Sequence, residues 1–133
     1  MPKFSDRSRE LLSGCDTRLQ DICCRAIEVM DFTIITGYRN KQDQDKALAE
    51  GKSKLKWPDG KHNKYPSLAV DICPYRNGLQ WNDKEAFILL AGIILGIATT
   101  KDIKIRWGGD WTQDFNLHND SFLDLGHFEL VEA

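Results

Sequence analysis

The most informative part of this 133-residue chain is the stretch at residues 61–71, KHNKYPSLAVD, which has a counterpart near the other end at residues 124–130, DLGHFEL. Between them, the two stretches supply two histidines and a carboxylate: His62, His127 and Asp71. Catalytic zinc takes three nitrogen and oxygen ligands of this kind and leaves a fourth position for water. The two stretches therefore indicate a candidate open zinc site.

Both stretches contain the alternation of a short strand. Residues 68–72 alternate so that Asp71 points away from its aliphatic neighbours. Residues 126–131 alternate in the same way and put His127 and Glu129 on one face. If these two strands are neighbours in a sheet, Asp71 and His127 lie side by side.

The rest of the sequence predicts helices around a small sheet. Apolar residues recur at three- and four-residue steps between residues 16 and 30, which is typical of a helix packed on a core. The other predicted elements are a short helix at 5–12, strands at 32–36 and 103–107, and helices that begin at Asn40 and at Asn82, the latter running to about residue 98. We expect an α+β fold in which helices pack on one face of a small, mainly antiparallel sheet and the other face carries the metal.

Length and composition limit the alternatives. A chain of 133 residues fits one domain, 1–133, with one core. The formal net charge of −2 gives no basic field for nucleic acid, and the densest basic stretch, residues 52–56, is typical of a solvated loop. Residues 87–98 are apolar, but a bilayer span needs about twenty such residues, so we expect a buried helix and no membrane insertion.

Two further features bear on the compartment. Residues 1–7 lack the apolar segment of a secretory signal, so we expect no export by that route. The four cysteines form no C-x-x-C pair, which favours buried thiols in a reducing cytosol over disulfides or thiolate zinc ligands.

Several segments resemble, in the same order, the signature of the LAS-type zinc peptidases. This family includes D-alanyl-D-alanine carboxypeptidases, vancomycin-resistance dipeptidases and phage L-alanyl-D-glutamate endolysins. The segments are TGYR at 36–39, His62, SLAVD at 67–71, WGGDW at 107–111 and GHFE at 126–129. His62 and Asp71 are nine positions apart, whereas the family usually has seven. The resemblance covers most of the chain.

The resemblance implies that His62, Asp71 and His127 hold Zn²⁺, that Asp124 is the catalytic base and that Arg39 contacts the substrate. It implies a peptidase that hydrolyses peptidoglycan stem peptides, at an L-alanyl-D-glutamate bond or at one involving D-alanine. We expect a monomeric phage or prophage endolysin, made in the host cytoplasm and reaching the cell wall after membrane permeabilisation.

Two further residues, Gln44 and Trp57, each allow a functional and a structural interpretation. Gln44 fits the family's Arg-x4-Gln pattern and could bind substrate, but on its helix it could equally be a polar residue at the edge of the core. Trp57 lies in the long loop at residues 52–67 and could form a wall of the substrate groove or pack under its own loop.

Three more polar residues have predicted roles outside the ligand set. Glu129 sits two residues beyond His127, which suits a partner that orients the histidine better than a base. Asp110 is expected to be structural. His118 is expected to be an exposed loop residue and not a ligand.

A function from another class also fits the pattern. The alternative is a non-catalytic zinc-binding protein of cell-wall recognition or of the virion. Asp124 and Arg39 beside the ligands favour the enzyme. A nuclease is suggested only by the pair at residues 62–63, and the net negative charge opposes it.

Overall fold

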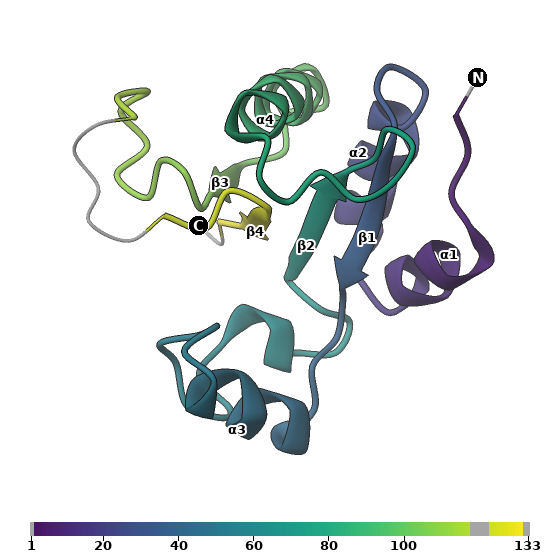
Figure 1. Ribbon diagram of the computed structural model, residues 1–133. Helices are drawn as coiled ribbons and strands as arrows, with labels where there is room; N and C mark the ends of the chain where they lie inside the picture. The colour runs from purple at the N-terminus through teal and green to yellow at the C-terminus, as the bar shows by residue number, and fades with distance from the viewer. Residues whose placement is uncertain (1, 118–122, 132–133) are drawn as a thin grey trace.

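The computed structural model describes residues 2–117 and 123–131. In chain order the elements are α1 (Asp6–Ser13), α2 (Thr17–Ala26), β1 (Phe32–Thr36), α3 (Lys41–Ala49), the 3-10 turn η1 (Lys61–Asn63), β2 (Ala69–Pro74), α4 (Lys84–Thr100), β3 (Ile105–Trp107) and β4 (His127–Leu130). Figure 1 shows α1, α2 and α4 around the strands, while α3 and η1 lie beyond the end where β1 finishes and β2 begins. The α+β prediction is confirmed.

The described strands form one sheet in the order β1-β2-β4-β3, and each neighbouring pair is antiparallel. Asp71 on β2 is the register partner of His127 on β4, as the alternation predicted. Arg106 on β3 is the partner of Glu129 on β4. Residues opposite each other in a ladder share a face, so these four side chains lie on one face of the sheet.

The opposite face of the sheet is apolar and packs on helices. Its buried side chains come in alternation from all four strands: Phe32, Ile34, Val70, Ile72, Ile105, Trp107, Phe128 and Leu130. They form one core with Ile22 of α2 and Leu90 of α4, the two helices expected to cover this face. Burial of one face fixes the strand register, because a slip of one residue would put Asp71 and His127 into this core.

The element boundaries differ from the predictions by a few residues. Asn40 caps α3 as predicted, since its side chain accepts a hydrogen bond from the amide of Asp43 at 2.8 Å. The helix predicted from Asn82 begins one residue later, because the carboxylate of Asp83 accepts the amide of Ala86. The helix predicted over 16–30 ends earlier, at Ala26, and continues as turns.

Two expectations from composition can be compared with the fold. Among the described residues no helix combines the length and the apolar character that a membrane span requires. The cysteines Cys15, Cys23, Cys24 and Cys73 are free thiols; the first, second and fourth are buried as predicted, but Cys24 is exposed.

Candidate metal centre and active site

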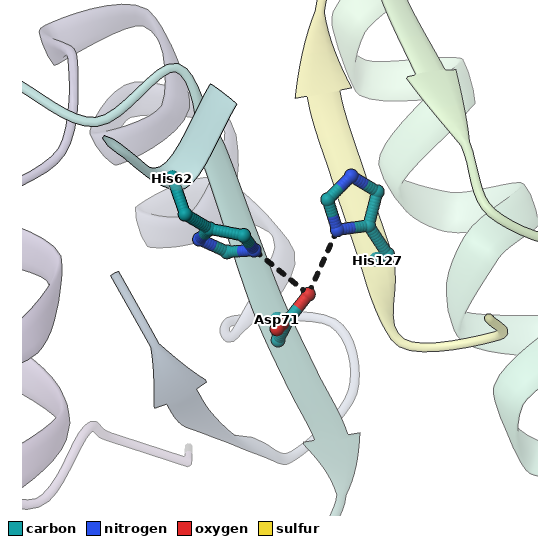
Figure 2. Close-up of side chains that lie close together, drawn as sticks. All are labelled: His62, Asp71 and His127. Carbon is teal, nitrogen blue, oxygen red and sulfur yellow. Dashed lines mark hydrogen bonds and ion pairs between the residues drawn. The ribbon is translucent and has the colours of Figure 1, made fainter. Parts of the chain in front are cut away.

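Three potential metal ligands meet on the polar face of the sheet. Asp71 and His127 project from neighbouring strands, and His62 reaches them from η1 (Figure 2). Nε2 of His62 lies 3.2 Å from Oδ1 of Asp71, and Nδ1 of His127 lies 2.9 Å from the same oxygen. One ligand atom from each residue lies within 4.8 Å of the other two. The structure thus brings together the three residues that the sequence nominated.

The state of His62 fits a metal ligand. Its Nδ1 lies 2.7 Å from the carbonyl oxygen of Gly37, and a carbonyl can only accept, so Nδ1 carries the proton. In the neutral ring the lone pair is then on Nε2, which is buried and has no well-formed hydrogen bond although Asp71 is close. A buried polar atom without a partner is costly unless a ligand satisfies it. Two imidazoles and a carboxylate are the donors that zinc takes.

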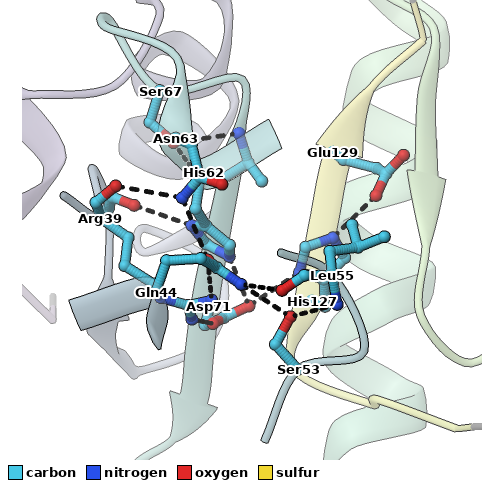
Figure 3. A network of polar contacts seen from close by, with 12 residues as sticks. Arg39, Gln44, Ser53, Leu55, His62, Asn63, Ser67, Asp71, His127 and Glu129 are labelled. Carbon is cyan, nitrogen blue, oxygen red and sulfur yellow. Dashed lines mark hydrogen bonds and ion pairs between the residues drawn. The ribbon is translucent and has the colours of Figure 1, made fainter. Parts of the chain in front are cut away.

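His127 is held from both sides of its ring. Nδ1 faces Asp71, and Nε2 lies 2.9 Å from Oε1 of Glu129. The other oxygen of Glu129 accepts a hydrogen bond from Arg106 at 2.8 Å and lies 3.4 Å from Nζ of Lys61. Figure 3 shows Glu129 on the side of the ring that faces away from Asp71. A carboxylate on Nε2 fixes a proton there, so in the neutral ring Nδ1 is the nitrogen that can act as a ligand.

The ionisation of this cluster favours positive charge between the carboxylates. Burial alone would lower the pKa of His127, but hydrogen bonds to Asp71 and Glu129 outweigh burial and raise it to about 9. Burial alone would raise the pKa of Glu129, but hydrogen bonds from His127 and Arg106 lower it to about 2. Burial likewise opposes ionisation of Asp71, yet the charges and hydrogen bonds of the two histidines hold its pKa well below its usual range. The buried carboxylates therefore stabilise positive charge on the imidazole ring between them.

Asp124 is placed beside the ligands by the backbone of the WGGDW segment. Its amide donates to the carbonyl of Gly108 at 2.8 Å, and Gly108 donates in turn to the carbonyl of His127 at 2.8 Å. A Cβ on Gly108 would lie 2.1 Å from the carbonyl oxygen of Asp124, so only glycine permits this approach. Burial, followed by the negative charge of Asp71, raises the pKa of Asp124. A raised pKa makes the carboxylate a better proton acceptor.

Arg39 lies within the same cluster. Its NH2 group is 3.4 Å from Oδ2 of Asp71, and its NH1 group donates to Oε1 of Gln44 at 3.0 Å. Its backbone amide donates to the carbonyl of His62 at 2.8 Å. Arg39 is therefore tied to two of the candidate ligands, through Asp71 and through the turn that carries His62.

Gln44 uses its whole amide group inside the protein. Its oxygen accepts from Arg39 and from Asn63, both at 3.0 Å. Its nitrogen donates to the hydroxyl of Ser53 and to the carbonyl of Leu55 (Figure 3). With 1% of its surface exposed, Gln44 joins Arg39, η1 and the loop after α3. These contacts favour the polar residue at the edge of the core over direct substrate binding.

Trp57 and Asp110 do not line the cavity that contains the ligands. Trp57 is half-buried. Asp110 accepts hydrogen bonds from the backbone amides of Asp114 and Phe115, at 3.3 and 2.8 Å, so it holds the loop after β3. His118 lies outside the described residues.

Two residues beside His127, Trp111 and Arg106, were not predicted from the sequence as part of the site. The ring of Trp111 lies 5.4 Å from the His127 ring, and the guanidinium of Arg106 lies 5.5 Å from the Trp111 ring. The signal for Arg106 was its alternation with Ile105 and Trp107, which puts it on the polar face. Its partnership with Glu129 depends on the β3–β4 register, which no local pattern reveals.

A cavity of about 340 Å³ opens onto the cluster. Arg39, His62, Asp71, Asp124 and His127 all line it. It offers a carboxylate, a guanidinium and three potential metal ligands to one bound molecule. These are the parts that a metal-dependent hydrolase requires, so the cavity is a candidate active site of that class.

Comparison with known proteins gives the family. The chain belongs to the phage L-alanyl-D-glutamate peptidase family, whose model matches residues 1–131. It is 35% identical, over 97% of its own length and 98% of the relative's, to the L-alanyl-D-glutamate peptidase of Escherichia phage T5. Its fold matches the crystal structure of Serratia marcescens L-Ala D-Glu endopeptidase ChiX with a TM-score of 0.77 at 22% identity, covering 98% of this chain and 91% of that one. The family resemblance seen in the sequence is confirmed.

Proposed function

We propose that this protein is a zinc-dependent peptidase that cleaves the L-alanyl-D-glutamate bond of peptidoglycan stem peptides, and that it serves a phage as an endolysin. The observation that carries the proposal is the meeting of His62, Asp71 and His127 beside Asp124 in one cavity. The family and the T5 relative support the bond. Residues 1–133 would act as one catalytic domain and as a monomer, made in the host cytoplasm and reaching the wall after membrane permeabilisation.

The metal would be held by Nε2 of His62, a carboxylate oxygen of Asp71 and Nδ1 of His127. When bound there, zinc supplies a Lewis acid that would polarise the scissile carbonyl and lower the pKa of water, so that water can act as the nucleophile near neutral pH. Glu129 and the Gly37 carbonyl keep each ring in the tautomer that this role needs.

Asp124 would accept the proton of the attacking water and return it to the nitrogen of the departing amine. It shares the cavity with the ligands, and its pKa is raised, both of which suit a general base. Arg39 would bind the scissile carbonyl or a nearby carboxylate. Asp71 and Gln44 engage two of its five N–H donors, and the planar fork suits such acceptors.

The test is mass analysis of purified peptidoglycan after digestion, together with the zinc content of the protein. We expect products with a new amino group on D-glutamate, an alanine left on the glycan, and one zinc per chain that is lost in a His62→Ala, His127→Ala double variant. Release of D-alanine instead would contradict the proposed bond. Binding to the wall without any cleavage would support the non-catalytic alternative, and full zinc content in the double variant would contradict the ligand set.

A further inference from the structure

A second hollow borders the candidate active site. It has a volume of about 740 Å³ and shares Arg39, Lys52, Asp71 and Asp124 with the cavity described above. The residues where the chemistry is proposed to occur therefore line both spaces. A peptide bond placed at Asp71 and Asp124 would have one side of the substrate in each space.

The two spaces differ in charge. Apart from the four shared residues, every residue that lines the second hollow is uncharged. The first cavity has further charged side chains, including the cations of Lys61 and Arg106. Charged groups of a substrate would thus be accommodated on the first side, and uncharged groups on the second.

The second hollow also has an exposed aromatic wall. Trp81 is 54% exposed, and its ring centroid lies 6.4 Å from that of the buried Phe87. Leu123, which is 40% exposed, lines the same hollow. An exposed tryptophan and leucine at the rim of a hollow offer an apolar surface on which a ligand can pack.

We propose that this hollow binds the acyl side of the substrate and that Trp81 packs against the sugar ring to which the alanine is attached. This inference rests on the proposed function. On the amine side of an L-alanyl-D-glutamate bond lies a carboxylate, which suits the first cavity. On the acyl side lie a methyl group and an uncharged sugar ring, whose C–H face can pack on an indole ring.

The experiment compares two substrates: a disaccharide-linked stem peptide and the same peptide without the sugar. We expect Trp81→Ala to lower kcat/KM for the sugar-linked substrate by roughly tenfold, mainly through KM, as for the loss of one aromatic contact. The sugar-free peptide should be cleaved as by the unchanged protein. Trp81→Phe should retain most of the preference. Leu79→Ala, which removes a nearby exposed side chain outside this hollow, is the matched control.

A second measurement does not depend on cleavage of the sugar-free peptide. N-acetylmuramyl-L-alanine, the acyl-side product, should inhibit the enzyme, and Trp81→Ala should weaken that inhibition by roughly the same factor. Equal losses on both substrates, or unchanged inhibition, would overturn the assignment of Trp81 while leaving the peptidase intact. If the unchanged protein cleaved neither substrate, the proposed function would fail and the subsite with it.

Discussion

At the residue scale, the site depends on which nitrogen of each histidine faces Asp71. His62 presents Nε2 because its Nδ1–H donates to the carbonyl of Gly37, and His127 presents Nδ1 because its Nε2–H donates to the carboxylate of Glu129. The two rings are thus oriented by different partners on different elements. The side chain of Glu129 can be changed without touching a ligand, whereas the partner of His62 is a backbone carbonyl, which no side-chain substitution removes.

The catalytic role of Asp124 can be tested by Asp124→Asn. The amide has the size of the carboxylate but cannot accept a proton, so we expect turnover to fall by roughly 100- to 10,000-fold. Zinc content and melting temperature should stay close to those of the unchanged protein. Near-normal hydrolysis of peptidoglycan would show that another group is the base.

For Arg39 we expect Arg39→Ala to lose most activity and Arg39→Lys not to restore it, because a lysine cannot provide two parallel donors. Hydrolysis and melting temperature should be measured on the same samples. Lys41→Ala removes an exposed cation paired with Asp45, an interaction worth about 0 to 1 kcal/mol, and is the control. If activity merely follows the folded fraction, Arg39 is structural.

Glu129 is expected to act through His127. Glu129→Ala removes the acceptor on Nε2 and should lower zinc affinity by roughly 10- to 100-fold, as found for partners of metal-bound histidines. Glu129→Gln keeps a carbonyl acceptor and should lose less. Competition with a chelator measures both affinities, and equal values for the alanine variant and the unchanged protein would remove this role.

Some contacts of single residues could be predicted from the sequence and others could not. Asp71 and His127 could be paired in advance because strand alternation is a local property and both strands carry a polar residue in the right phase. Gln44 remained ambiguous because its four partners come from three separate segments of the chain. The group formed by Trp111 and Arg106 beside His127 was missed, because it forms only when segments distant in sequence come together.

At the element scale, the approach of β4 to β2 depends on a glycine. A Cβ on Gly126 would lie 2.3 Å from the carbonyl oxygen of Ile72, whose amide donates to Gly126. We expect Gly126→Ala to lower stability by about 1 to 3 kcal/mol, since the strands must separate. Denaturant unfolding measures this change.

The matched control is Gly92→Ala on α4. A Cβ there meets nothing within 4 Å, and alanine favours a helix over glycine by about 1 kcal/mol. This variant should therefore be more stable, and its activity should be unchanged. A destabilised Gly92→Ala would contradict the packing of α4 as described.

The elements were predicted better than their ends. Alternation predicted β2, β3 and β4, and a step of three and four residues predicted α2, because burial of one face imposes a period. The prediction of β1 rested on its β-branched and aromatic residues, and that of α4 on its continuous apolar run. The turn η1 was read as part of a long loop, since it owes its shape to contacts of Asn63 with Gly60, Arg39 and Gln44. Those contacts have no repeating pattern.

At the scale of the whole molecule, the ligands join three elements, η1, β2 and β4. A metal bound to the folded state alone stabilises it by about 4 kcal/mol when its free concentration is a thousand times the Kd. We expect a chelator to lower the melting temperature of the unchanged protein and to leave that of the His62→Ala, His127→Ala double variant unaffected. If the chelator lowered the melting temperature of both proteins equally, the metal would not be bound through His62 and His127.

The strand order has a consequence for synthesis. β4 follows β3 in the chain but lies between β2 and β3 in the sheet. While the ribosome is still making the chain, β3 therefore has no neighbour in the sheet, and Asp71 has no histidine partner on β4. Domains fold as units, so the third candidate ligand joins the other two only when β4 has been made and inserted between β2 and β3. A chain that stops before β4 therefore lacks both His127 and the sheet neighbour of β3, and it cannot assemble the candidate site.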